Sequence, residues 1–139
     1  MAEMSVLNLV DYVGVSAPSE LDLAGMIEQG LPLESVNRLR EKGLTFSEVA
    51  DVVISPRTLK HRKARGEQLS NEEADRVVRV ARIVALAEQV FHNHDKGLAW
   101  LRTPDDRVQG RTPLSLLHTE SGGRAVENML WQIDDGVYA

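Results

Sequence analysis

Apolar residues recur every three or four positions along much of the chain, which places them on one face of a helix. One such stripe ends before Gly43 and predicts a helix near residues 33–42, and another predicts a short helix starting at about Thr45. The first stripe consists of Leu33, Val36 and Leu39, and the second of Phe46, Val49, Ala50 and Val53. Glycine commonly ends helices and threonine commonly caps their start. We expect both stripes to face the core.

A third helix is predicted by the start signal Ser55-Pro56 and should run to about Arg65. Serine is a favoured N-cap, and proline suits the first helical position because its missing N–H is not needed there. This helix is mostly polar, and only a few residues separate it from the one before. Two short helices joined in this way, with an apolar stripe on the first, are typical of a helix-turn-helix.

The longest predicted helix starts at a capping box, Ser70 to Glu73, and reaches about residue 91. Its apolar face consists of Ala74, Val77, Val78, Ala81, Val84, Ala85 and Phe91. Arg76, Arg79 and Arg82 are expected on the opposite, exposed side. Arginines on such a surface are usually solvated or paired with nearby acids, so they are secondary candidates for contacts to DNA phosphates.

Shorter helices are predicted on either side of this part of the chain. One covers about residues 21–28, another lies around residues 96–101, and a third begins at Thr112-Pro113. The last helix ends near Gly136 and carries the apolar stripe Val126, Met129, Leu130 and Ile133. These segments leave little of the chain outside predicted helices after residue 30.

The pattern as a whole predicts an all-α fold. Aromatic residues make up only 4% of the chain, so the core must be built mainly from aliphatic side chains on helical stripes. We divide the sequence into an N-terminal segment (1–30), a helix-turn-helix region (31–82) and a C-terminal helical domain (83–139).

Composition excludes several classes of protein. The absence of cysteine excludes disulfides, thiol nucleophiles and thiolate zinc sites. Residues 1–30 lack the features of a signal peptide, and no apolar run approaches the length of a membrane span, so we expect a soluble, cytoplasmic protein. The histidines lack metal-ligand spacing and no phosphate-cradling glycine motif occurs. We therefore expect no catalytic residue, no metal and no cofactor.

The net charge of -5 hides an uneven distribution along the chain. Residues 1–35 contain six acidic and no basic residues, residues 36–82 contain eleven basic and seven acidic residues, and residues 83–139 contain five and eight. A basic middle between acidic ends is expected when one segment meets a polyanion and the rest does not.

The polar helix after Ser55 is the candidate DNA-binding element. Its proposed contact residues are Arg57, Thr58, Lys60, His61, Arg62, Lys63 and Arg65. Cationic side chains there can neutralise phosphates, and Arg57, Thr58 or His61 can reach base edges in the major groove. The alternative interpretation is a solvated basic helix without a ligand. We favour DNA because the helix-turn-helix pattern and the basic charge coincide in this segment.

The C-terminal half resembles the toxin-binding domain of the Xre/MbcA/ParS antitoxin family. The resemblance rests on Trp100, Leu101, Pro104, Val108, Gly110, Pro113, Leu116, Leu117, Thr119, Gly122, Val126, Leu130, Ile133 and Gly136. The resemblance continues upstream, so it covers about residue 31 to the end. The upstream matches are Ser55 to Leu59, Arg62-Lys63, Gly66, Leu69-Ser70 and the long helix. The sequence departs from the family's pattern at two places. Asp105-Asp106 stands where the family often has a turn that contains asparagine, and Val108 stands where leucine is common.

The resemblance implies an Xre/Cro-like helix-turn-helix packed with a C-terminal toxin-binding domain. It also implies an antitoxin that binds and inhibits a RES-domain toxin, an NAD-consuming enzyme, and represses its own operon by binding operator DNA. Most matched residues have structural roles, with Trp100 and Leu117 in the core and with Gly110 and Gly122 in turns that need a permissive backbone. Because helix-turn-helix proteins commonly bind two half-sites, we also expect a homodimer.

Candidate toxin contacts lie at the end of the chain. Trp131 falls outside the last apolar stripe, and an exposed aromatic side chain is a common interface anchor. Asp134, Asp135, Gly136, Val137 and Tyr138 follow, and their acids could mimic the phosphates of a cofactor in the toxin's active site. The alternative is an uninvolved, frayed tail. For the whole chain, one alternative is a free-standing helix-turn-helix transcription regulator with a C-terminal dimerisation or ligand-sensing domain. The other is an interaction adaptor that has lost DNA binding.

Overall fold

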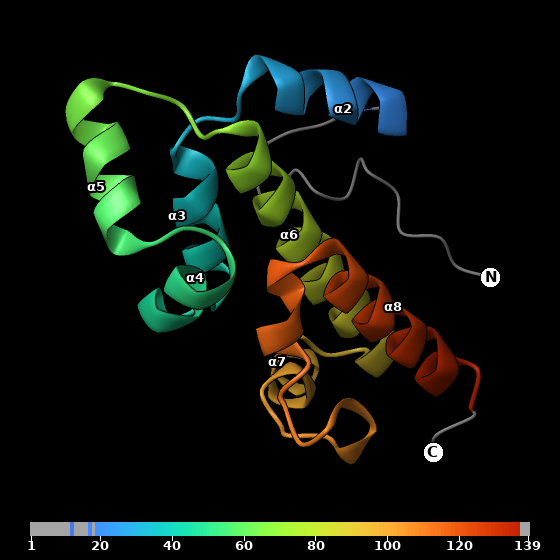
Figure 1. The fold of residues 1–139 in the computed structure, drawn as a ribbon. Helices are drawn as coiled ribbons and strands as arrows, with labels where there is room; N and C mark the ends of the chain where they lie inside the picture. The colour runs from blue at the N-terminus through green and yellow to red at the C-terminus, as the bar shows by residue number, and fades with distance from the viewer. Residues whose placement is uncertain (1–11, 13–16, 18, 137–139) are drawn as a thin grey trace.

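The computed structural model describes residues 12, 17 and 19–136, and these form helices joined by short loops (Figure 1). The described residues contain no strand, only an isolated bridge between Asp105 and Arg111. The prediction of an all-α fold is therefore confirmed. No helix in this part of the chain is both long and apolar enough to cross a membrane.

Apart from the 3₁₀ helix η2, which was not predicted, the helices lie where the sequence signals indicated, to within a few residues. In chain order they are α2 (Glu20–Gln29), α3 (Glu34–Glu41), α4 (Phe46–Val52), α5 (Pro56–Arg65), α6 (Asn71–Phe91), α7 (His94–Leu101), the 3₁₀ helices η2 (Asp106–Val108) and η3 (Leu114–His118), and α8 (Glu120–Asp134). Helices α4 and α5 with the turn between them form the helix-turn-helix.

Helix α6 is the centre of the molecule, and α2, α3, α7, α8 and η3 all contact it. Eleven of its 21 residues are buried, more than the single apolar face expected from the sequence. The buried residues are Glu73, Ala74, Val77, Val78, Val80, Ala81, Ile83, Val84, Leu86, Ala87 and Val90. A helix that is apolar around so much of its circumference must be covered from several sides, here by both halves of the chain.

The helix starts are set by short polar side chains, as predicted. Thr45 and Glu48 form a capping box at α4, and Ser70 and Glu73 form another at α6. The hydroxyl of Ser55 accepts a hydrogen bond from the Thr58 backbone N–H at 3.1 Å and so caps α5. These local bonds satisfy backbone groups that a helix leaves unpaired at its first turn.

The position of Phe46 differs from the prediction. Val49 and Val53 are buried, but the Phe46 side chain is 53% exposed. Phe46 is the first residue of α4, where the stripe extends beyond the edge of the core, and the guanidinium of Arg40 lies 5.6 Å from its ring centroid. The cation covers one face of the ring, which partly compensates for its exposure.

The arginines of α6 are paired instead of solvated, and Arg79 pairs with the nearby Asp75 at 2.9 Å, as one of the two expectations had it. Arg76 Nε donates a hydrogen bond to the Val53 carbonyl oxygen at 2.7 Å, and Arg79 donates one to the Leu117 carbonyl oxygen at 3.1 Å. Arg82 pairs with Glu20. Because α6 is covered from several sides, these side chains lie between helices and bind carbonyl oxygens or acids there.

The segment before α8 also differs from the prediction in two details. The helix expected at Thr112-Pro113 is the 3₁₀ helix η3, and Gly122 lies in the first turn of α8 instead of in a loop. A Cβ on Gly122 would overlap the backbone oxygen of Leu116, so glycine allows the close approach of α8 to η3. Gly110, with φ +76°, does occupy a turn that favours glycine.

Replacing Gly122 by alanine should therefore destabilise the protein. The added methyl group meets backbone, which cannot rotate away, and overpacking of this kind costs about 1–3 kcal/mol. Urea unfolding followed by circular dichroism measures the change in the free energy of unfolding.

Gly25→Ala is the matched control, because Gly25 lies inside α2 with nothing within 4 Å of the position that a Cβ would occupy. Alanine there should stabilise the protein by roughly 0.5–1 kcal/mol through the lower entropy of the unfolded chain. Equal effects of the two substitutions would contradict the packing role of Gly122.

Candidate nucleic-acid interface and partner surface

Helix α5 separates two sets of side chains. Leu59 is half-buried and packs against the core, whereas the cations Arg57, Lys60, Lys63 and Arg65 are exposed. His61 is exposed as well. At 100° per residue, the outward face of the helix is centred on Arg57, Lys60 and His61, and Lys63 and Arg65 lie on its two flanks.

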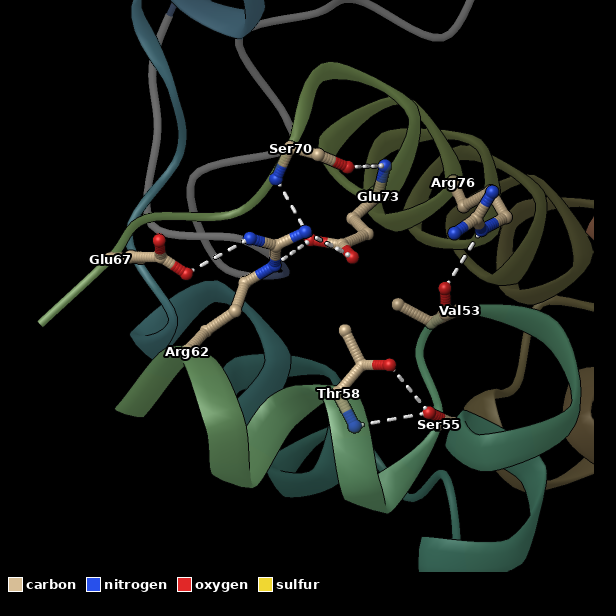
Figure 2. A network of polar contacts seen from close by, with 8 residues as sticks. All are labelled: Val53, Ser55, Thr58, Arg62, Glu67, Ser70, Glu73 and Arg76. Carbon is tan, nitrogen blue, oxygen red and sulfur yellow. Dashed lines mark hydrogen bonds and ion pairs between the residues drawn. The ribbon is translucent and has the colours of Figure 1, made fainter. Parts of the chain in front are cut away.

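Thr58 does not belong to this outward face. It is half-buried, and its Oγ1 accepts a hydrogen bond from Ser55 Oγ at 2.8 Å (Figure 2). Its backbone N–H is bound to the same serine. The predicted base-reading residue thus takes part in the cap of α5, because position N3 of a capped helix turns toward the N-cap.

Arg62 is also turned inward, toward the start of α6. Its Nε donates to Glu73 Oε1 at 2.7 Å and its second terminal nitrogen donates to Glu73 Oε2 at 3.0 Å, while Glu67 accepts at 3.3 Å (Figure 2). The prediction that Arg62 is an exposed cation available to phosphates is therefore wrong. A planar guanidinium matches a carboxylate in this two-bond geometry, so the pair holds α5 against α6 in one orientation.

Glu73 stays ionised although it is one of two buried polar residues among those described. Burial raises the pKa of its carboxyl, but the hydrogen bonds from Arg62 and from the Ser70 backbone N–H, with the positive charge of Arg62, outweigh burial and lower the pKa. The hydrogen bond to Glu73 in turn raises the pKa of Arg62. One carboxylate therefore caps α6 and anchors α5 at the same time.

Sequence reasoning assigned Glu73 only to the capping box and missed its second role. Arg62 and Glu73 are eleven positions apart, with Gly66 between them, and no helical periodicity connects the two helices. Arg76 was missed for the same reason: it holds the turn between α4 and α5 through the Val53 carbonyl oxygen, 23 positions away. The only signal in the sequence for these contacts was the surplus of charged residues near the start of α6.

The predicted toxin contacts lie at the end of α8. Trp131 is half-buried against the core, and its indole N–H donates to Glu127 at 3.4 Å, so it is less exposed than predicted. Asp134, Asp135 and Gly136 are exposed, and α8 ends there with Gly136 at φ +81°. Val137 and Tyr138 lie outside the described residues.

Two family models match the chain. Residues 22–82 match the antitoxin Xre-like helix-turn-helix domain, and residues 86–136 match the antitoxin Xre/MbcA/ParS C-terminal toxin-binding domain. The chain is also 37% identical over 118 residues to an "Antitoxin Xre" of Pseudomonas putida, covering 85% of this chain and 74% of that protein. The chain belongs to the Xre antitoxin family.

Other members of the Xre family and a more distant antitoxin are also similar to it. An "Antitoxin Xre" of Yersinia enterocolitica is 33% identical over 88 residues, or 62% of this chain and 59% of that protein. A "Prs ADP-ribosylating antitoxin" of Sphingobium is 24% identical over 139 residues, or 92% of this chain and 87% of that protein. The Xre helix-turn-helix match contains α5, and the toxin-binding match contains α7, η2, η3 and α8.

The lowered pKa of Glu73 predicts a pH dependence of stability. Its carboxylate contributes stability above the glutamate pKa of the unfolded chain, about 4.3, and loses it as the pH falls through the lower pKa of the folded state. Urea unfolding between pH 3 and pH 7 should show this loss in the wild type and a smaller loss in Glu73→Gln. An unchanged pH profile in the variant would contradict the role assigned to this carboxylate.

Proposed function

We propose that this Xre-family chain is the antitoxin of a type II toxin–antitoxin module. It neutralises a RES-domain, NAD-consuming toxin by covering the toxin's active site, and it represses its own operon through the helix-turn-helix. The main support is the separation of two surfaces on one molecule: the basic outward face of α5 in the helix-turn-helix, and the toxin-binding part around α7 and α8. One chain can therefore engage both partners.

DNA is bound by the outward face of α5 in this proposal. Arg57, Lys60 and His61, at the centre of the face, reach base edges, and the flanking Lys63 and Arg65 neutralise phosphates. A homodimer presents two such helices to the two half-sites of an operator. The ion pair between Arg62 and Glu73 supports this arrangement because it fixes the orientation of α5.

Substitution of the flank and of the centre of α5 should have different effects on DNA binding. Lys63→Gln should weaken binding to all sequences and lower the slope of log affinity against log salt concentration by about 1, because one phosphate contact is lost. Arg57→Ala should cost about 1–3 kcal/mol at the specific site and relax specificity there. Fluorescence anisotropy at several salt concentrations measures both, with duplexes from upstream of the gene and of random sequence.

Gln68→Ala is a suitable control, since Gln68 is exposed in the loop between α5 and α6 and carries no charge. If Arg57→Ala weakened binding to both duplexes equally, Arg57 would be a phosphate contact and not a base-reading residue.

The toxin is engaged by the C-terminal part of the chain in this proposal. Trp131 contributes contact surface, and Asp134, Asp135 and Gly136 are exposed at the end of α8, from which Val137 and Tyr138 continue the chain. These carboxylates take the place of the phosphates of the dinucleotide in the toxin's cleft. Inhibition then follows from occlusion and needs no catalytic group in the antitoxin.

Co-expression with the protein encoded by the neighbouring gene tests the antitoxin function. A stable complex should copurify through a tag on either partner, and NAD consumption by the partner should stop in the complex. The amount of NAD that remains after incubation with the purified partner, measured by an enzymatic cycling assay, reports the inhibition. Absence of a complex, with DNA binding retained, would identify the chain as a free-standing helix-turn-helix regulator.

Truncation after Ile133 tests how the toxin is inhibited. Removal of residues 134–139 should leave the complex intact, because the packed part of α8 remains, but should restore a large fraction of NAD consumption, because both carboxylates are lost. The same truncated chain should bind DNA like the wild type, since α5 is unaffected. Complete inhibition by the truncated chain would contradict insertion of the tail.

A further inference from the structure

The two functional parts of the molecule share α6. The helix-turn-helix match ends at residue 82 and the toxin-binding match starts at residue 86, both inside this helix. Helix α6 connects the two parts along the chain. Helix α4, the first helix of the helix-turn-helix, is connected to the toxin-binding part by side contacts, among them its packing against η3. The contacts that hold α4 therefore help to fix the position of the helix-turn-helix relative to the toxin-binding part.

Helix α7 of the toxin-binding part lies against the loop that joins α3 to α4. At its start, a ring nitrogen of His94 lies 2.7 Å from the Lys42 carbonyl oxygen. In the middle, Leu98 occupies the space that a Cβ on Gly43 would need, and Gly43 has φ +109°. The Leu98 side chain thus packs directly against the backbone of Gly43, and the positive φ there favours glycine.

Arg102 completes this contact at the end of α7. Its Nε donates to Glu48 Oε2 at 2.7 Å, one terminal nitrogen donates to Glu48 Oε1 at 2.8 Å, and the same nitrogen donates to the Gly43 carbonyl oxygen at 2.7 Å. The Glu48 side chain is only 19% exposed. A guanidinium that binds a carboxylate with two bonds and a carbonyl with a third sets position and orientation together.

The carboxylate that Arg102 binds is also the one that caps α4. Glu48 accepts a hydrogen bond from the Thr45 backbone N–H at 2.8 Å. Burial raises the pKa of Glu48, but the hydrogen bonds and charge of Arg102, together with the bond from Thr45, lower it below its usual value. The start of α4 is therefore fixed by a charged side chain from the other half of the chain.

The opposite end of α4 is held by α6. Arg76 Nε donates to the Val53 carbonyl oxygen at the turn that leads into α5 (Figure 2). Together, Arg102 and Arg76 place α4 at both ends against the elements that carry the toxin-binding part.

We infer that Arg102 is a positioning residue for DNA binding, through which the toxin-binding part holds the first helix of the helix-turn-helix in place. This inference rests on the proposed DNA-binding function. In a helix-turn-helix the first helix crosses the DNA backbone while the second lies in the major groove, so both must keep a fixed relation to bind. Arg102 itself need touch no phosphate.

Arg102→Gln and Glu48→Gln test the inference, separately and together. Glutamine at position 48 keeps the capping box, because glutamine is also accepted at this position, and it removes the charge and one of the two oxygens that Arg102 binds. Arg107→Gln is the matched control: it removes an ion pair of the same part, between Arg107 and Asp105, that lies outside the contact with α4. The probe is a duplex covering the DNA immediately upstream of the gene.

Arg102→Gln should lower the affinity for this duplex about three- to tenfold, and Glu48→Gln should do the same. The salt dependence should keep its slope, unlike that of Lys63→Gln, because no phosphate contact is lost. The double variant should bind like Arg102→Gln alone, since Arg102→Gln already removes the whole contact that Glu48→Gln weakens. Hydrogen exchange of the backbone amides of residues 44–54 should accelerate in the same variants and not in Arg107→Gln.

The inference would be overturned if Arg102→Gln, Arg107→Gln and the wild type bound the duplex with equal affinity. Additive effects of Arg102→Gln and Glu48→Gln would overturn it as well. Failure of the wild type to bind any duplex would instead refute the proposed DNA-binding function. Hydrogen exchange of residues 44–54 in the free protein would then still decide whether Arg102 holds α4: faster exchange in Arg102→Gln supports it, and unchanged exchange refutes it.

Discussion

The burial of α6 is the constraint on which the rest of the structure depends. A helix with apolar side chains around so much of its circumference is stable in water only when other elements cover it, and here both halves of the chain contribute to the cover. The N-terminal half supplies α2 and α3, and the C-terminal half supplies α7, α8 and η3. The helix-turn-helix and the toxin-binding part therefore have a core in common, although they match separate families of domains.

Long arginine side chains connect the elements around this core. Arg62 joins α5 to α6, Arg76 joins α6 to the turn before α5, and Arg79 joins α6 to η3. Arg102 joins α7 to α4. Each binds a carbonyl oxygen or a carboxylate at least partly shielded from water, where charge-assisted hydrogen bonds are stronger than on an open surface. With so few aromatic residues available, orientation is set by these contacts as much as by the shapes of apolar side chains.

On α5, one set of side chains holds the helix in place and another set faces outward. Thr58 and Arg62 face the protein and set the cap and tilt of the helix, while Arg57, Lys60 and His61 face outward. A basic helix with all its cations free would be attracted to DNA but poorly oriented on it. The inward Arg62 removes one charge from the outward face and fixes the orientation of α5, and a fixed orientation is a property that base recognition requires.

The sequence by itself determined the helices, their starts and the order of the two parts, because caps, proline at the first helical position and apolar spacing act within a few residues. It also located the helix-turn-helix and the family. Tertiary structure alone decided which side of α5 faces outward, since the partner of Arg62 lies eleven positions away on another helix. It likewise decided the exposure of Phe46, the close packing at Gly122 and the contact of Arg102 with Glu48, 54 positions apart. Such contacts depend on how helices approach in space, and no local pattern of residue types records that approach.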